Sequence, residues 1–337
     1  MRDAVADHIW SSGAVPARMA RAVLTPFGWL FGGVVAARNL AFDKRWLRSH
    51  PVALPTISIG NLTVGGTGKT PVSAWVVAEL RARGANPAIV MRGYGGDEPL
   101  VHERLNGGVP VVVSPDRVAG VAKAAEGGAT VAVLDDAFQH RRARRDVDIV
   151  LLSADRFGPV RPLPAGPWRE PLTALSRAQF VVVTRKSASL LRAKELLQHA
   201  LRFAPKAAGA IVYLAPDALV AADGSQREPV EVIRNTTVVA VSAIGDPRAF
   251  ESQLRNAGAL VTSLSYADHH RFTAEDVVAI LSRAKGATRV ICTLKDAVKI
   301  GRIWPRTAPS LWYLSQRVVV EAGGEAFDAL FSRFASR

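Results

Sequence analysis

Residues 63–70 form the segment whose composition and spacing most clearly indicate chemistry. They read Thr-Val-Gly-Gly-Thr-Gly-Lys-Thr and lie between a predicted strand and a predicted helix. A glycine-rich turn in this context is typical of a P-loop, in which backbone N–H groups at a helix N-terminus surround the phosphates of a nucleotide. The residues expected to contact the nucleotide are Thr63, Val64, Gly65, Gly66, Thr67, Gly68, Lys69 and Thr70.

Two side chains of this turn have expected roles of their own. Lys69 would reach the β- and γ-phosphates, and the Thr70 hydroxyl would bind Mg²⁺. Thr63 occupies the position at which the usual P-loop pattern has its first glycine. The alternative is an ordinary tight turn between a strand and a helix, but the combination of strand, glycines, Lys-Thr and helix favours the P-loop.

An apolar run over residues 131–134 ends in two adjacent carboxylates, Asp135 and Asp136. Ligands of open α/β sheets bind beyond the carboxyl ends of the strands, so an aspartate here could hold Mg²⁺. Two neighbouring carboxylates repel each other unless a cation or hydrogen-bond donors lie between them. The alternative is a turn in which an aspartate accepts local hydrogen bonds. Beside a P-loop, the magnesium interpretation is favoured.

A kinase that acts on an alcohol needs a group that orients the hydroxyl and accepts its proton. Asp97 follows a predicted strand in a glycine-rich loop, and His269 lies in a later Asp-His-His segment. A carboxylate paired with an imidazole suits proton removal near neutral pH. Each residue alone also fits a structural role, as a turn aspartate or a structural histidine, and spacing does not decide between these roles.

A proline-dense loop over 163–171 and an arginine run over 141–145 add charged candidates. In the loop, Arg169 could stabilise charge on the transferred phosphate and Glu170 could assist Mg²⁺, or both could be incidental surface charges. The run has four arginines in five residues, which suits phosphates or lipid head groups and equally suits a solvated face. The sequence leaves these alternatives open.

The hydrophobic pattern predicts the framework that must position these candidates. Short apolar runs are expected as buried strands at 56–59, 88–91, 130–134, 148–152 and 180–184, with a helix at 71–83 after the first of them. Continuous apolar runs are typical of a parallel sheet covered on both faces. We therefore predict an α/β fold with a P-loop NTPase-like, doubly wound and mostly parallel sheet.

A second, smaller α/β series follows the first. Its strands are predicted at 238–243, 260–264 and 289–293, and its helices at 247–256 and 273–285. A mixed stretch with one short strand candidate at 211–214 separates the two series. We divide the chain into an N-terminal region 1–50, a P-loop core domain 51–205 and a smaller α/β domain 206–337, whose final helix could pack back on the core.

Composition narrows the class of protein further. The 337 residues include 43 Lys and Arg against 29 Asp and Glu, a formal net charge of +14. This excess favours anionic partners such as phosphates or an acidic membrane surface, and it equally describes a basic solvated surface. The one cysteine, Cys292, excludes an internal disulfide and a cysteine-based zinc site, and it fits a reducing compartment.

The N-terminal region contains an uncharged stretch of sixteen residues, 22–37, which includes Pro26 and several bulky apolar side chains. The stretch is shorter than the roughly 20 apolar residues of a spanning helix, and it lacks a signal-peptide cleavage pattern. Basic residues flank it, and Trp and Phe lie within it. This pattern favours a helix lying in the membrane interface over an amphipathic helix docked on its own domain.

Several of these segments together resemble one family, the tetraacyldisaccharide 4′-kinases of lipid A biosynthesis. The matching stretches, in the expected order, are 60–71, 92–94, 96–99, 115–117, 135–136, 138–142, 163–171, 268–270 with Phe272, and Thr293 with Lys295, Asp296 and Lys299. The P-loop that begins with Thr63 is itself a mark of the family.

The resemblance implies transfer of the γ-phosphate of ATP to the 4′-hydroxyl of a tetraacyldisaccharide 1-phosphate, giving the 1,4′-bisphosphate. It implies that Asp97 is the base and is paired with His269. The residues it assigns to Mg²⁺ are Thr70, Glu170 and one of Asp135 and Asp136. Those it assigns to the transferred phosphate are Lys69 and Arg169. The N-terminal helix would then dock peripherally at the cytoplasmic face of the bacterial inner membrane.

Two other classes of protein compete with this one. A P-loop GTPase should carry Asn-Lys-x-Asp, but residues 184–187 read Thr-Arg-Lys-Ser. A nucleotide-dependent metal-delivery switch should carry clustered Cys and His, but only His269 and His270 are adjacent. A nucleic-acid-binding protein has only the arginine run as local support, so no nucleic acid is expected as a partner. The sequence does not determine the oligomeric state.

Overall fold

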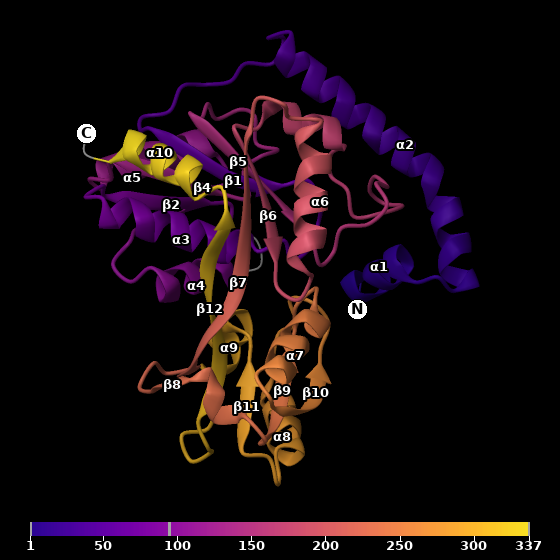
Figure 1. Ribbon diagram of the computed structural model, residues 1–337, viewed down its shortest axis with the longest axis vertical. Helices are drawn as coiled ribbons and strands as arrows, with labels where there is room; N and C mark the ends of the chain where they lie inside the picture. The colour runs from indigo at the N-terminus through magenta and orange to yellow at the C-terminus, as the bar shows by residue number, and fades with distance from the viewer. Residues whose placement is uncertain (1, 94–95, 336–337) are drawn as a thin grey trace.

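The computed structural model describes residues 2–93 and 96–335, which form two lobes joined by one sheet (Figure 1). Tyr94, part of one stretch that resembles the kinase family, lies outside the described residues. The strands are β1 Thr56–Asn61, β2 Pro87–Met91, β3 Val111–Val113, β4 Val131–Asp135, β5 Val147–Ser153, β6 Phe180–Arg185, β7 Ala208–Ala221, β8 Arg227–Pro229, β9 Thr237–Ser242, β10 Leu260–Ser265, β11 Arg289–Cys292 and β12 Leu311–Ala322.

Helices cover both faces of this sheet and extend beyond it. The α-helices are α1 Arg2–Ser11, α2 Val15–Asp43, α3 Lys69–Ala82, α4 Glu98–Leu105, α5 Arg117–Glu126, α6 Leu190–Leu201, α7 Pro247–Asn256, α8 Ala274–Arg283, α9 Leu294–Ile300 and α10 Gly324–Phe334. Two short 3₁₀ helices are η1 Leu172–Arg177 and η2 Val230–Ile233.

The larger lobe is built on the parallel strands β6-β5-β1-β4-β2-β3, which lie side by side in that order. Alternate side chains of these buried strands pack against α3 and α10 on one face and against α5 and α6 on the other. The C-terminal helix α10 packs on this lobe, because Phe327 and Phe331 contact the ring of Trp75 edge-on at centroid distances of 4.8 and 5.4 Å. The result is a P-loop-type core covered on both faces.

Two long antiparallel strands, β7 and β12, run between the lobes (Figure 1). One edge of β7 pairs in parallel with β6 over residues 208–213 and with β8 over 218–220, while its other edge pairs with β12 over 211–221. The smaller lobe continues the sheet through β11, β9 and β10, with α7 on one face and α8 and α9 on the other. The division at residue 206 stays a proposal, since one sheet passes through both lobes.

The strands and helices predicted in both α/β series are present, with ends within two residues of those predicted. The exception is the short candidate at 211–214, which is part of the 14-residue strand β7. The predicted α/β class with a mostly parallel, doubly wound sheet is confirmed. Helices α4, α5, α6 and α9, and strands β3 and β12, are additions that the hydrophobic pattern did not predict.

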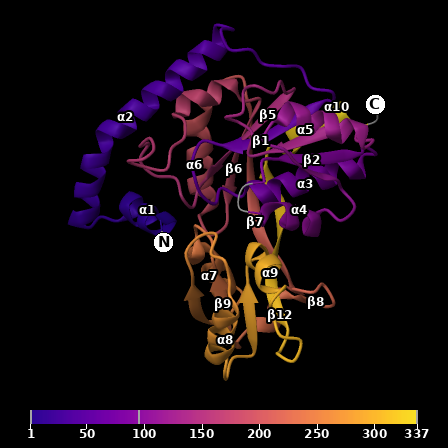
Figure 2. The same cartoon turned by 180° about the vertical axis from the view of Figure 1, so that it is seen from behind.

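Helix α2 lies along the outside of the larger lobe and continues through Pro26 for 29 residues (Figure 2). Gly28 faces the lobe, and a Cβ atom at this position would lie 3.3 Å from the carbonyl oxygen of Pro162. The opposite face is apolar and exposed. Among the described residues, α2 is the helix whose length and composition would allow it to cross a membrane.

Candidate active site

The glycine-rich turn joins the end of β1 to the start of α3, as a phosphate-binding loop requires. Gly65 and Gly68 have φ angles of 105° and 82°, which a residue with a side chain rarely adopts. A Cβ atom on Gly68 would also lie 2.6 Å from Cδ1 of Leu214. Thr184 fixes the turn from the side, because its hydroxyl donates a hydrogen bond of 2.9 Å to the carbonyl of Thr67.

The proline-dense loop is bonded to the beginning of this turn. The backbone N–H of Val64 donates to the carbonyl of Pro167 at 2.8 Å, and Thr63 forms a β-bridge with Trp168. The N–H of Arg169 in turn donates to the carbonyl of Leu62 at 2.7 Å. This backbone pairing brings the Arg169 side chain beside the P-loop, where it shares the Asp136 carboxylate with Lys69, and its role toward the transferred phosphate stays a prediction.

Lys69, Asp136 and Arg169 meet at the mouth of the P-loop. Asp136 has a left-handed backbone, with φ of 50°, and its carboxylate is about one-third exposed. Its oxygens accept hydrogen bonds of 2.9 and 3.0 Å from Arg169, and Oδ1 lies 3.7 Å from Nζ of Lys69. Two cations therefore converge on one accessible carboxylate at the site expected for phosphate and metal.

Asp135 points away from this opening and is buried. Its Oδ2 pairs with Nε2 of His102 at 2.9 Å, and its Oδ1 accepts from the Ser73 hydroxyl and the Asp136 N–H, both at 3.0 Å. Burial acts to raise the pKa of Asp135, but the interactions with His102, Lys69 and Ser73 outweigh it and hold the pKa below its ordinary value. The two neighbouring aspartates thus have different environments.

Asp97 and His269 come together across the boundary between the lobes. Oδ2 of Asp97, which precedes α4, lies 3.7 Å from Nδ1 of His269 and 3.8 Å from Nζ of Lys299. Burial acts to raise the pKa of Asp97, but His269 and the charges of Lys295 and Lys299 hold it below its ordinary value. The Asp97 carboxylate, in turn, raises the pKa of His269. Both groups therefore favour their charged forms.

Two further cations, Lys295 and Lys299 of α9, lie at this site. The prediction from sequence that Asp97 is the base and His269 its partner did not include them. Lys295 lies 3.7 Å from Glu98, the residue after Asp97. The pKa of Glu98 is raised, first by burial and also by Asp135 and Asp136, so α4 begins within electrostatic reach of the aspartate pair. Lys295 and Lys299 are four residues apart, which places them on one face of a helix. This spacing is the feature of the sequence that could have identified them.

Glu170 and the arginine run have mainly structural partners in this structure. The Glu170 carboxylate accepts two hydrogen bonds from Arg177, at 2.8 and 3.0 Å, and one of 2.7 Å from Asn39 of α2. Within the run, Arg141 pairs with Asp43 and Arg145 with Asp148, whereas Arg142 and Arg144 are exposed. A metal-binding role for Glu170 stays a prediction, and it would require the carboxylate to exchange partners.

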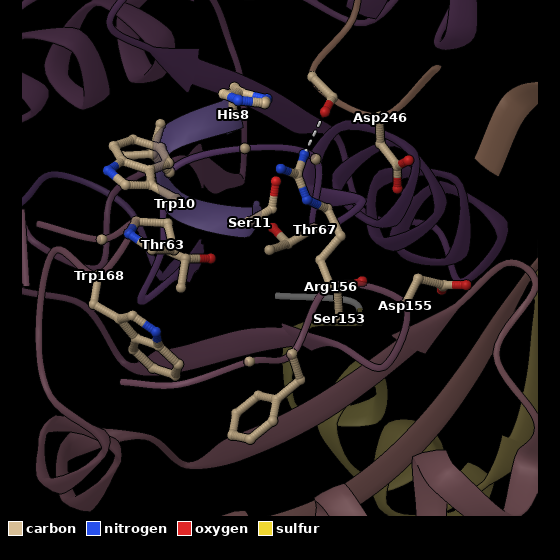
Figure 3. Close-up of a pocket in the computed structure, with 18 of the residues that line it drawn as sticks. His8, Trp10, Ser11, Thr63, Thr67, Ser153, Asp155, Arg156, Trp168 and Asp246 are labelled. Carbon is tan, nitrogen blue, oxygen red and sulfur yellow. Dashed lines mark hydrogen bonds between the residues drawn. The ribbon is translucent and has the colours of Figure 1, made fainter. Parts of the chain in front are cut away.

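A cavity of about 790 Å³ opens beside the P-loop (Figure 3). It is lined by residues 63–67, by the segment after β5, by α1 and by the loop between β9 and α7 of the smaller lobe. Arg156 crosses it and donates a hydrogen bond of 2.6 Å to the carbonyl of Gly245. The volume falls in the range of small-molecule sites, so a nucleotide or part of an acceptor would fit between the lobes.

The residues at the P-loop suit Mg²⁺ bound jointly with phosphates. The Thr70 hydroxyl and the Asp136 carboxylate are the hard oxygen ligands that this ion takes. Mg²⁺ typically uses one or two carboxylates together with substrate phosphates and waters. Accordingly, the described residues contain no cluster of three or more His, Cys, Asp or Glu that could hold a metal by itself.

Comparisons with known proteins agree on one family. A family model described as tetraacyldisaccharide-1-P 4′-kinase matches residues 20–96 and 95–335. The tetraacyldisaccharide 4′-kinase of Halorhodospira halophila is 37% identical over 352 aligned positions, covering 97% of each chain. The enzyme of the same name from Anaeromyxobacter sp. strain K is 38% identical over 299 positions, covering 80% of this chain and 79% of its own. A crystal structure of LpxK from Aquifex aeolicus in complex with ATP is 28% identical, with a TM-score of 0.74, and covers 94% of this chain and 100% of that one.

Proposed function

The chain belongs to the tetraacyldisaccharide-1-P 4′-kinase family, and on that premise we propose that it transfers the γ-phosphate of ATP to the 4′-hydroxyl of a tetraacyldisaccharide 1-phosphate. The product would be the 1,4′-bisphosphate of the lipid A pathway. The observation that carries the proposal is the position of Asp97, which immediately precedes α4, a helix that packs against α3 behind the P-loop, and which meets His269 from the other lobe.

The larger lobe supplies the phosphate-binding half of the site. Backbone N–H groups of the turn before Lys69 would surround the phosphates, and Lys69 and Arg169 would offset the charge on the phosphate being transferred. Thr70 and Asp136 would hold Mg²⁺, which neutralises negative charge on the phosphates when bound. Asp135, whose two oxygens are engaged by buried donors, would act through its neighbours.

Asp97 supplies the group that accepts the proton of the acceptor hydroxyl. Its Oδ1 atom is buried and has no hydrogen-bond partner among the described residues. A buried, unpaired carboxylate oxygen calls for an explanation, and a substrate hydroxyl donating to it would provide one. His269 and Lys299, both near Oδ2, would keep the carboxylate ionised and oriented.

We propose that α2 and the residues that follow it bind a membrane surface, which would also present the lipid acceptor. The exposed face of α2 carries a stripe of bulky apolar side chains, namely Met19, Val23, Phe27, Leu30 and Val34. Beyond the helix, Trp46 is 74% exposed and lies between Arg45 and Arg48. An apolar stripe next to Trp and basic residues suits peripheral binding at an anionic bilayer surface. We assign that surface to the cytoplasmic face of the inner membrane, where ATP is available.

Incubation with γ-labelled ATP, Mg²⁺ and the disaccharide 1-phosphate tests the proposed function. We expect label in a new monoester at the 4′ position, identified by mass spectrometry and phosphorus NMR of the extracted lipid. Omission of the disaccharide is the control for simple ATP hydrolysis. Label released only as inorganic phosphate, at the same rate with and without the disaccharide, would rule the proposal out.

A further inference from the structure

His102 lies on α4, five residues after Asp97, and its side chain is fully buried. Its Nε2 atom is 2.9 Å from Oδ2 of Asp135. An ionised carboxylate can only accept, so the imidazole N–H is the donor. Nδ1 of the same ring is buried and has no hydrogen-bond partner among the described residues, so within that part of the chain Asp135 is the one polar partner of this side chain.

Asp135 is also bonded to the helix that follows the P-loop. The Ser73 hydroxyl of α3 donates to Oδ1 at 3.0 Å, and Ser73 is fully buried. The carboxylate thus joins α3, which begins at Lys69, to α4, which begins directly after Asp97. The two helices carry the phosphate-binding lysine and the expected base at their N-terminal ends.

We propose that His102 is a positioning residue for phosphoryl transfer, which fixes α4 and therefore Asp97 relative to the P-loop by its bond to Asp135. This inference rests on the proposed kinase function. Transfer depends on the base lying within hydrogen-bond reach of the acceptor hydroxyl, and small displacements of such a group lower the rate steeply. Helix α4 has only eight residues, and its contacts from Glu98 to Lys295 and from Arg104 to the carbonyl of Ala222 reach the smaller lobe, whereas the bond from His102 to Asp135 ties it to the larger lobe.

The alternative is that His102 only satisfies the buried charge of Asp135 and stabilises the fold. Both roles predict a loss of stability when the bond is removed. Only positioning predicts that turnover falls while the affinity for ATP is kept, and that a side chain with a donor at the same reach restores turnover. These two readouts separate the alternatives.

Three variants at position 102 and one control provide the test. His102→Leu removes the donor and keeps an apolar side chain, and His102→Gln places an amide donor at a similar reach. His102→Asn keeps a polar side chain that is too short. Val101→Ala is the control, since Val101 is buried on the same helix, and its truncation loses packing without removing a hydrogen bond to Asp135.

We expect kcat to fall about 10- to 100-fold in His102→Leu, by analogy with the loss that follows mutation of a residue that orients a metal ligand. The KM for ATP should change little, and His102→Gln should recover most of the turnover. Equal kcat in the Gln and Asn variants would overturn the proposal, and this comparison remains available if His102→Leu does not fold. A fall in kcat as large in Val101→Ala would also overturn it.

Amide hydrogen exchange in the protein without nucleotide or metal gives a readout that is independent of activity. Amides of α4 should exchange faster in His102→Leu than in Val101→Ala, while amides of α5 serve as the internal reference. Unchanged protection of α4 would overturn the positioning role even if the chain is a kinase. The wild-type protein could instead lack kinase activity while the α4 amides exchange faster in His102→Leu. That result would contradict the proposed function but not the structural role of His102.

Discussion

Oδ2 of Asp97 lies 3.7 Å from Nδ1 of His269, although the two residues belong to different lobes. The larger lobe holds Asp97 at the start of α4, which packs against α3, and the smaller lobe brings His269 and Lys299 to the same carboxylate. The base is therefore complete only where the lobes meet. Its environment should depend on how closely they approach each other.

Replacing Asp97 with alanine should abolish most of the turnover and leave ATP binding nearly intact. General-base catalysis contributes about 10²- to 10⁴-fold to rate, so kcat should fall by that order. Turnover is measured on the labelled disaccharide and affinity with a fluorescent ATP analogue. Asp328→Ala, at an exposed position on α10, is the control. If Asp97→Ala lost ATP binding instead, Asp97 would not be the base.

Replacing Lys69 with alanine should weaken nucleotide binding as well as turnover. Lys69 begins α3 at the mouth of the P-loop and is the cation expected to contact the β- and γ-phosphates. Lys123→Ala removes an exposed lysine of α5 and should leave both quantities unchanged. Wild-type affinity and turnover in Lys69→Ala would reject the P-loop assignment.

Gly68→Ala should destabilise the protein and damage the nucleotide site. The left-handed backbone costs about 1–2 kcal/mol for a residue with a side chain. The contact with Leu214 adds an overpacking cost of about 1–3 kcal/mol. Gly66→Ala is the folding control, because nothing lies within 4 Å of its Cβ position. Equal melting temperatures for the two variants would contradict the geometry described for this turn.

The contact between Asp97 and His269 should make stability depend on pH. The pKa of His269 is raised in the folded protein, so its contribution is complete below the ordinary histidine value of about 6.5 and is lost as pH rises through the folded value. The pKa of Asp97 is lowered, so its contribution is complete above about 3.9 and is lost as pH falls through its lower folded value.

Thermal unfolding of the wild type and of His269→Gln, from about pH 5 to about pH 9, measures this effect. The difference in melting temperature should be largest at the acidic end of that range and shrink toward the basic end. Asp97→Asn should remove most of the pH dependence of the difference. A difference that grows with pH would show that His269 is not stabilised in its charged form.

Membrane association should depend on the exposed stripe of α2. Replacing Phe27, Leu30 and Val34 together with serine should reduce co-sedimentation with vesicles that contain anionic lipid, because these side chains are 59, 68 and 60% exposed and contribute little to the core. The matched control replaces Leu191, Leu260 and Val278, which are similarly exposed elsewhere on the protein. Full co-sedimentation of the α2 variant would show that this stripe does not anchor the protein to the membrane.

The sequence predicted the layers of the fold because buried parallel strands are continuous apolar runs. It predicted β7 poorly, since residues 208–221 pass from one lobe to the other and change partners along their length. Helix α4 was missed for a related reason. It is short and mostly polar on one side, and its position depends on a bond from His102 that no local pattern reveals.

The candidate site could be predicted where a motif has its own physical signature. The P-loop has one, in its glycines and Lys-Thr, and so does the pair of carboxylates at the end of β4. The different environments of Asp135 and Asp136 could not be predicted, because they arise from the left-handed backbone at Asp136 and from donors on α3 and α4. Arg177 and Asn39 are the hydrogen-bond partners of Glu170. Tertiary packing brings them together, so the sequence could not predict this pairing either.

A crystal structure with a non-hydrolysable ATP analogue, Mg²⁺ and the disaccharide 1-phosphate tests the central claim most directly. We expect the terminal phosphate to lie against the amides preceding Lys69, with the 4′-hydroxyl facing it and donating a hydrogen bond to Asp97. A nucleotide bound away from this turn, or a 4′-hydroxyl beyond hydrogen-bond reach of Asp97, would contradict it.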